Sequence, residues 1–244
     1  MAVFAALYYI LSLVSPEIPI SISGVSISLE ALIATIFGLV LGPYLGTATA
    51  FLGAFVAWTL PPSGMAIYGL PFLLSPPINA LVSGLIFYKK GKWGLLAFSG
   101  LIIAFLFTPP VQPLTENSIV AIAVLFDKII AALLILPLLK FSKQLSIGQG
   151  AAFFFILAFI GNQADNMWGS LAFATPMVYG GIFQMPLDFV RAGFLAAPFA
   201  YPAIRLIQAF FATLIAIPLM KTLKGTPWLW RKENILSENQ ETQT

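Results

Sequence analysis

The chain has 244 residues, of which 59% are hydrophobic and only 9% are charged. Soluble domains carry roughly a quarter charged residues, so these proportions exclude a water-soluble globule, a disordered chain and a nucleic-acid-binding protein. The net charge of +3 is the basic excess expected of a membrane protein. We therefore expect an all-α, polytopic helix bundle in the cell membrane, surrounded by the lipid bilayer.

Candidate membrane helices follow one another along most of the chain. The apolar segments lie at about 2–15, 28–41, 43–60, 70–88, 93–108, 118–139, 149–167 and 194–220. A full span needs about 20 apolar residues, so the first two segments are short and we expect roughly six to eight membrane segments. The stretch 168–193 is too interrupted by Gly and Pro for a helix to be assigned.

The basic residues fall into three groups, and each group follows an apolar segment. The groups are Lys89, Lys90 and Lys92, then Lys140 and Lys143, and finally Lys221, Lys224, Arg231 and Lys232. By the positive-inside rule these groups are cytoplasmic, which predicts that both termini are cytoplasmic and that the loops near 16–27, 61–69 and 109–117 are outside. The N-terminus resembles a first membrane helix rather than a cleaved signal peptide. We expect a single transmembrane domain over 1–232 and a polar, disordered tail over 233–244.

The sequence contains no Cys and no His. This excludes disulfides, zinc sites, His-dependent nucleophilic catalysis and His-based proton relays, and it disfavours a nickel or cobalt carrier. We expect no metal site, no cofactor and no enzymatic activity. The sequence also has no ATP-binding motif, so uphill transport driven by ATP would require an ATPase on another chain.

Small residues recur at helical spacing near the N-terminus. Ala2 and Ala6 are one such pair, and a longer series runs through Gly38, Gly42, Gly46, Ala50 and Ala54, divided into two helices by Pro43. Small residues at i and i+4 lie on one face and let a second helix approach closely. Either series serves packing within the bundle or docking of a partner subunit, and Ala2 and Ala6 are the better candidates for docking because the first helix is expected to be peripheral.

The first 90 residues or so contain AVFAALYYILSLV, with its A-x-x-x-A motif, and the turn GLVLGPYLG from Gly38 to Gly46. With these motifs, this part of the chain resembles the substrate-binding (S) subunits of energy-coupling factor transporters. The resemblance implies a subunit that captures a small, vitamin-like nutrient outside and docks on a membrane coupling subunit that carries paired ATPases. That family has about six helices in a shorter chain, and the polar stretch 161–170 matches none of its motifs, so the resemblance does not identify the substrate.

Several ionisable residues are expected at membrane depth, where they are costly and usually functional. With a rise of about 1.5 Å per residue, Glu30, Lys128, Asp165 and Arg205 lie ~18–25 Å from the inner face, all in the outer half of the bilayer. This agreement predicts one polar cavity that opens to the outside.

Each of these residues also has a structural interpretation. Asp127 and Lys128 are about 100° apart on a helix, so we expect them not to pair with each other but one of them to pair with Arg205 or Asp165. Arg205 is alternatively placed to extend toward the outer headgroups, and Glu30 to sit near the outer water.

The stretch GNQADNMWG, from Gly161 to Gly169, concentrates polar side chains at one end of an apolar segment. Asn162, Gln163, Asp165, Asn166 and Trp168 together suit recognition of a heterocycle or an amide, because amides both donate and accept hydrogen bonds and Trp offers a stacking face. The alternative is a helix terminus with capping Asn residues and an interfacial Trp.

Further polar positions extend the candidate site. Asn79 follows two prolines within an apolar segment. It hydrogen-bonds either the backbone groups that the prolines leave without partners or a ligand. Gln208 lies one turn from Arg205 and faces the same side. Trp58 and Tyr68 flank the loop PPSGMAIYG and either cover the cavity or belong to the interfacial aromatic belt.

These features favour a substrate-capture subunit for a small molecule, with a coupling subunit as partner. The main alternative is a self-sufficient, ion-coupled permease in which Asp127, Asp165 or Glu30 binds a proton or sodium ion. An intramembrane aspartyl enzyme built on Asp127 and Asp165 is disfavoured, because LFDKI and QADNM lack the G-x-G-D context of such proteases.

Overall fold

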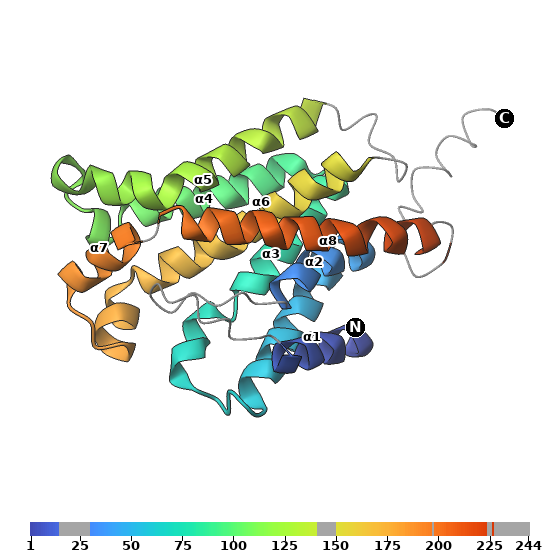
Figure 1. The fold of residues 1–244 in the computed structure, drawn as a ribbon, viewed down its shortest axis with the longest axis horizontal. Coiled ribbons are helices and arrows are strands. Elements are labelled where there is room, and N and C mark those ends of the chain that lie inside the picture. The colour runs from blue at the N-terminus through green and yellow to red at the C-terminus, as the bar shows by residue number, and fades with distance from the viewer. Residues whose placement is uncertain (15–29, 141–149, 197, 224–225, 227–244) are drawn as a thin grey trace.

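The computed structural model of the chain describes residues 1–14, 30–140, 150–196, 198–223 and 226, and the regular structure in this part is all helical (Figure 1). The α-helices are α1 (Ala2–Val14), α2 (Glu30–Thr59), α3 (Ser75–Phe87), α4 (Gly91–Leu106), α5 (Leu114–Lys140), α6 (Ala151–Phe173), α7 (Leu187–Ala196) and α8 (Ala200–Leu223). Two 3₁₀ segments, η1 (Ile67–Phe72) and η2 (Pro109–Val111), and a π turn, η4 (Met177–Ile182), connect them.

Four stretches in the described part of the chain are long and apolar enough to cross a membrane: Leu32–Thr59, Ile67–Phe87, Leu114–Leu139 and Ala200–Leu223. Two shorter apolar helices, Ala2–Leu13 and Gly91–Leu106, accompany them. The protein is therefore an all-α, multi-pass membrane protein. The polar tail predicted over 233–244 lies outside the described residues.

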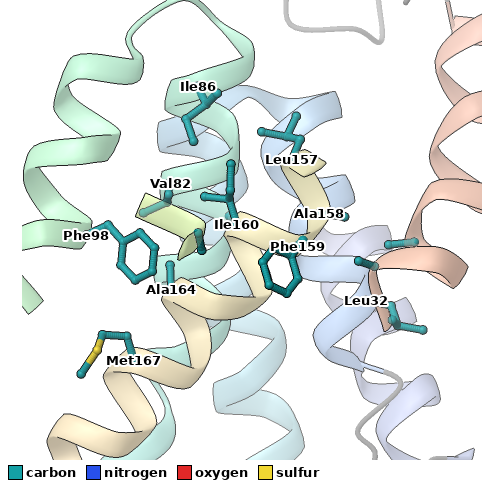
Figure 2. Packing of buried hydrophobic residues seen from close by; sticks show 14 of the residues in the cluster. Leu32, Val82, Ile86, Phe98, Leu157, Ala158, Phe159, Ile160, Ala164 and Met167 are labelled. Carbon is teal, nitrogen blue, oxygen red and sulfur yellow. The ribbon is translucent and has the colours of Figure 1, made fainter. Parts of the chain in front are cut away.

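Helix α6 is the centre of the bundle and contacts α2, α3, α4, α5 and α8 (Figure 1). On one side of α6, the side chains of Ile160, Ala164 and Met167 pack with Val82 of α3 and Phe98 of α4 (Figure 2). All five residues are buried. This apolar side fixes the rotation of α6, and its opposite side carries the polar residues described below.

Helix α2 is sharply kinked, as the sequence predicted from Pro43. Gly42 has a left-handed backbone, with φ of 82°, and a proline at the next position removes one backbone donor. The carbonyl that loses this donor belongs to Leu39, and the Tyr88 hydroxyl donates to it at 2.7 Å. Burial raises the pKa of Tyr88, so the hydroxyl stays protonated as a donor.

The glycine series on α2 packs inside the bundle. A Cβ at Gly38 would overlap the Ala80 carbonyl of α3, and one at Gly46 would lie 2.5 Å from the Phe37 carbonyl across the kink. Ala50 is also fully buried. These contacts support the packing interpretation of the series.

Described members of all three basic groups lie at one end of the bundle. The Lys89–Lys92 turn is close to the end of α5, since a Cβ at Gly91 would lie 2.6 Å from Leu139. The rings of Phe87 and Phe153 are 6.3 Å apart, which places the start of α6 at the same end. Helix α8 runs antiparallel to α6, so its last turn, with Lys221, ends there too (Figure 1).

Two predicted boundaries were wrong. The segment predicted at 149–167 continues as α6 to Phe173, so the stretch 168–193 begins as regular helix and then forms η4 and α7. The segment predicted at 194–220 is two elements, because α7 ends at Ala196 and α8 begins at Ala200.

Candidate functional site

Four polar side chains occupy a single turn in the interior of α6. Asn162, Gln163, Asp165 and Asn166 are all buried, and with about 100° between successive residues they fall within roughly 160° of the helix circumference. We call these four residues the polar arc. Because α6 continues to Phe173, the interpretation of this stretch as a capped helix terminus was wrong.

A chain of hydrogen bonds ties one edge of the polar arc to α2 and α3. The Thr35 hydroxyl donates to Asn79 Oδ1 at 2.7 Å, and Asn79 Nδ2 donates to Asn162 Oδ1 at 3.0 Å. The helices approach closely here because residue 161 is glycine, and a Cβ at Gly161 would overlap Asn79 Oδ1. The contacts favour a structural role for Asn79, which holds the amide oxygen of Asn162.

Arg205 of α8 meets the polar arc at Asp165. The guanidinium Nη2 lies 3.5 Å from Asp165 Oδ1, and Nη1 donates to Gln208 Oε1 at 2.8 Å. Gln208 is therefore on the same side as Arg205, as predicted. The ion pair holds Arg205 within the bundle, with its side chain 14% exposed, rather than extended to the headgroups.

Asp127 and Lys128 of α5 form a second buried ion pair, with Lys128 Nζ 3.0 Å from Asp127 Oδ1. The expectation that these neighbours do not pair was wrong, because the long, flexible lysine side chain bends back to the preceding residue. Lys128 also lies close enough to Arg205 for their like charges to interact. The charged groups of α5, α6 and α8 thus lie close together. The predicted cavity that opens to the outside stays a prediction.

Five buried side-chain atoms in this region have no hydrogen-bond partner among the described residues. They are Asn162 Nδ2, Gln163 Nε2, Gln163 Oε1, Asn166 Nδ2 and Arg205 Nε. A buried polar atom without a partner costs about 1–3 kcal/mol, and buried polar groups are almost always satisfied in native proteins. Four of these atoms lie on neighbouring residues of α6 and the fifth on the facing Arg205 of α8, and such a concentration is typical of a site where a ligand completes the hydrogen bonding.

The aromatic candidates Trp168, Tyr68 and Trp58 each connect neighbouring segments of the chain. Trp168 Nε1 donates to the Pro71 carbonyl at 3.0 Å, which joins α6 to η1. Tyr68 packs on Phe183, with ring centroids 5.3 Å apart, and so links η1 to the end of η4. Trp58 donates to the Ala66 carbonyl at 2.8 Å and holds the intervening turn.

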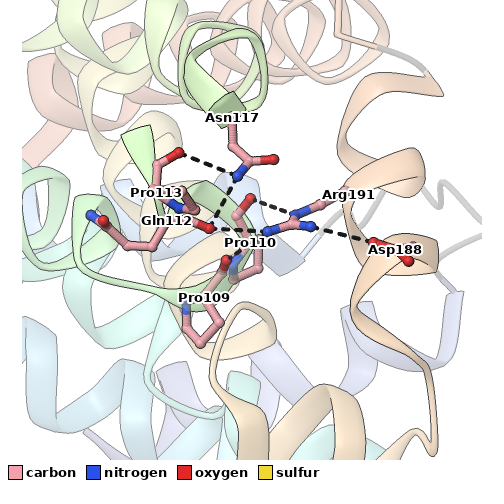
Figure 3. Close-up of polar contacts among 7 residues, drawn as sticks. All are labelled: Pro109, Pro110, Gln112, Pro113, Asn117, Asp188 and Arg191. Atoms are coloured by element: carbon pink, nitrogen blue, oxygen red, sulfur yellow. Dashed lines mark hydrogen bonds and ion pairs between the residues drawn. The ribbon is translucent and has the colours of Figure 1, made fainter. Parts of the chain in front are cut away.

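Asp188 and Arg191, three residues apart on α7, form an ion pair at 3.3 Å, but the Asp188 side chain is 94% exposed, so the pair itself contributes little. Arg191 Nε instead donates to the Pro110 carbonyl at 3.1 Å, and Nη2 donates to the Gln112 carbonyl at 3.0 Å (Figure 3). Arg191 therefore connects α7 to the turn between α4 and α5 and makes these contacts outside the polar arc.

Two remaining predictions concern the N-terminal third of the chain. Glu30 is the first residue of α2, but its side chain lies outside the described residues. On α1, Ala5 and Tyr8 face the bundle and are buried, whereas Ala2 and Ala6 are exposed.

Thr35, which sequence reasoning missed, begins the chain of hydrogen bonds through Asn79. Its only signal in the sequence was a hydroxyl in an otherwise apolar run.

No family model, curated protein or solved structure matches this chain.

Proposed function

We propose that this protein captures a small polar solute within the membrane, at the polar arc of α6 and the facing Arg205. The observation that carries the proposal is the group of buried amide and guanidinium atoms that have no partner among the described residues. The opposite side of α6 is packed with apolar side chains. Burial of these polar atoms therefore costs free energy unless a ligand binds them.

The proposed role is that of the S subunit of an ATP-driven importer of the energy-coupling factor type. The resemblance of GLVLGPYLG and the A-x-x-x-A motif supports it, as does the position of the described basic groups at one end of the bundle, which fits cytoplasmic termini under the positive-inside rule. In this role, the exposed Ala2 and Ala6 face of α1 docks on the coupling subunit, and paired ATPases on other chains supply the energy.

Solute capture is tested by native mass spectrometry of the full-length protein purified in nanodiscs. We expect a bound small molecule that is lost from Asn166→Leu and kept by the matched control Asn117→Leu. Within the described part of the chain, the Asn117 side chain bonds to the Gln112 and Pro113 carbonyls of a turn. Absence of any bound molecule from the wild-type protein, or equal occupancy in Asn166→Leu, would contradict the proposal.

The docking role has its own test. Ala2→Leu and Ala6→Leu together should leave solute binding unchanged but abolish uptake by cells that express the complete importer, because larger side chains prevent close helix approach. Val3→Leu, a nearby change on an already large and exposed residue, is the control and should transport normally. Loss of binding along with uptake would show that the α1 face is not a docking surface.

An ion-coupled permease is the second candidate, favoured by the two buried ion pairs Asp127–Lys128 and Asp165–Arg205. Paired ionisable residues within membrane segments often mark ion pathways and proton relays. Uptake by proteoliposomes that contain only this protein, driven by a proton or sodium gradient, distinguishes this candidate. An energy-coupling factor subunit shows no such uptake.

A further inference from the structure

The unpartnered atoms at the polar arc include both hydrogen-bond donors and an acceptor, and this composition restricts the ligands that can bind there. Four are donors, namely Asn162 Nδ2, Gln163 Nε2, Asn166 Nδ2 and Arg205 Nε, and one is an acceptor, Gln163 Oε1. The direction of the Asn162 amide is fixed, since its oxygen already accepts from Asn79. The complementary solute therefore has several acceptor atoms and at least one donor.

The charge of the region restricts the solute further. Among the described residues, the charged side chains here form the pairs Asp127–Lys128 and Asp165–Arg205, and these four groups together carry no net charge. An ionised solute would have to break one of these pairs or remain an uncompensated charge in a low-dielectric environment, and both are costly. The balance favours a neutral solute.

Gln163 supplies the most specific feature. It is completely buried, and it alone has both a donor and an acceptor among these unpartnered atoms. A primary amide presents its N–H and its C=O side by side, so its best partner has a C=O beside an N–H, as a cyclic amide does. A carboxylate cannot donate to Gln163 Oε1, and an ammonium group cannot accept from the four donors.

We infer that the solute is a neutral heterocycle with a cyclic-amide edge, which pairs with Gln163 through two hydrogen bonds while further ring nitrogens or carbonyls accept from Asn162, Asn166 and Arg205. This inference rests on the proposed function, because it describes the ligand of the same site. It adds the chemical class of the solute and the residue that selects it.

The test uses the full-length protein in nanodiscs and three matched pairs of probes. Each pair is a cyclic amide and its N-methylated form: uracil and 1,3-dimethyluracil, hypoxanthine and 1-methylhypoxanthine, and lumazine and 1,3-dimethyllumazine. Binding is measured by saturation-transfer NMR and by isothermal titration. Loss of one hydrogen bond in a buried site reduces affinity by ~10-fold, so we expect at least one cyclic amide to bind at least ~10-fold more tightly than its methylated form.

Variants assign this preference to Gln163. In Gln163→Leu the difference between the cyclic amide and its methylated form should disappear, and in Gln184→Leu, the same substitution at an exposed glutamine, it should remain. The inference is overturned if the wild-type protein binds both members of each pair equally, or if the preference is unchanged in Gln163→Leu. Neither result contradicts the proposal of solute capture. A protein that carries no solute by mass spectrometry and binds none of the six probes overturns both.

Discussion

Replacing Gln163 with leucine should make the ligand-free protein more stable, although the residue is completely buried at the centre of the bundle. Neither polar atom of its amide has a partner among the described residues, so the folded state bears the cost of desolvating them. That cost is about 1–3 kcal/mol. Leucine has a similar size and no polar atoms, and it should recover most of this free energy.

The expected gain can be measured by thermal unfolding of the purified protein in detergent, after any bound solute has been removed. A stabilisation of 1 kcal/mol corresponds to a rise in Tm of about 2–4 °C for a chain of this size. Gln208→Leu is the matched control, because Gln208 is equally buried but accepts a hydrogen bond from Arg205 Nη1. Removal of the Gln208 amide leaves the charged Arg205 Nη1 without this acceptor and should lower the free energy of unfolding by about 1.5–3 kcal/mol.

The two variants therefore shift Tm in opposite directions, although the chemical change is the same. A fall in Tm for Gln163→Leu as large as that for Gln208→Leu would refute the reasoning, because it would mean that the Gln163 amide is satisfied in the ligand-free protein.

Two further predictions concern packing around the site. Tyr88→Phe should lower the free energy of unfolding by about 1–2 kcal/mol, since the Leu39 carbonyl loses the donor that replaces the missing proline N–H; an unchanged denaturation midpoint would contradict this. Gly161→Ala should lower the free energy of unfolding by about 1–3 kcal/mol, because the new methyl group overlaps Asn79 Oδ1. At Gly100 a Cβ meets nothing within 4 Å, so Gly100→Ala should be neutral or stabilising in the same assay.

The sequence was most informative about features that depend on local chemistry. Length and apolarity predicted the membrane helices, and Pro43 predicted the kink in α2, because a proline inside a helix has few structural outcomes. The clustering of Lys and Arg predicted a basic end, and described members of all three groups lie there. Helical spacing alone placed Gln208 beside Arg205.

Features that depend on side-chain conformation or on distant contacts could not be predicted. Helical spacing separates Asp127 from Lys128, yet the lysine side chain is long enough to bend back, and only packing decides that it does. The bond between Asn79 and Asn162 joins residues far apart in the sequence. The polar stretch in α6 left a binding site and a capped helix terminus both open, because the sequence does not reveal that five other helices contact this one.

Site-directed labelling tests the central claim most directly, because the natural chain contains no cysteine. Asn166→Cys places a thiol in the polar arc, and Ala164→Cys places one at a similar depth on the apolar side of α6; the native residues are 8% and 0% exposed. If the polar arc admits a small hydrophilic solute, a charged methanethiosulfonate reagent should modify Asn166→Cys and leave Ala164→Cys unmodified. Equal rates at the two positions would contradict the account.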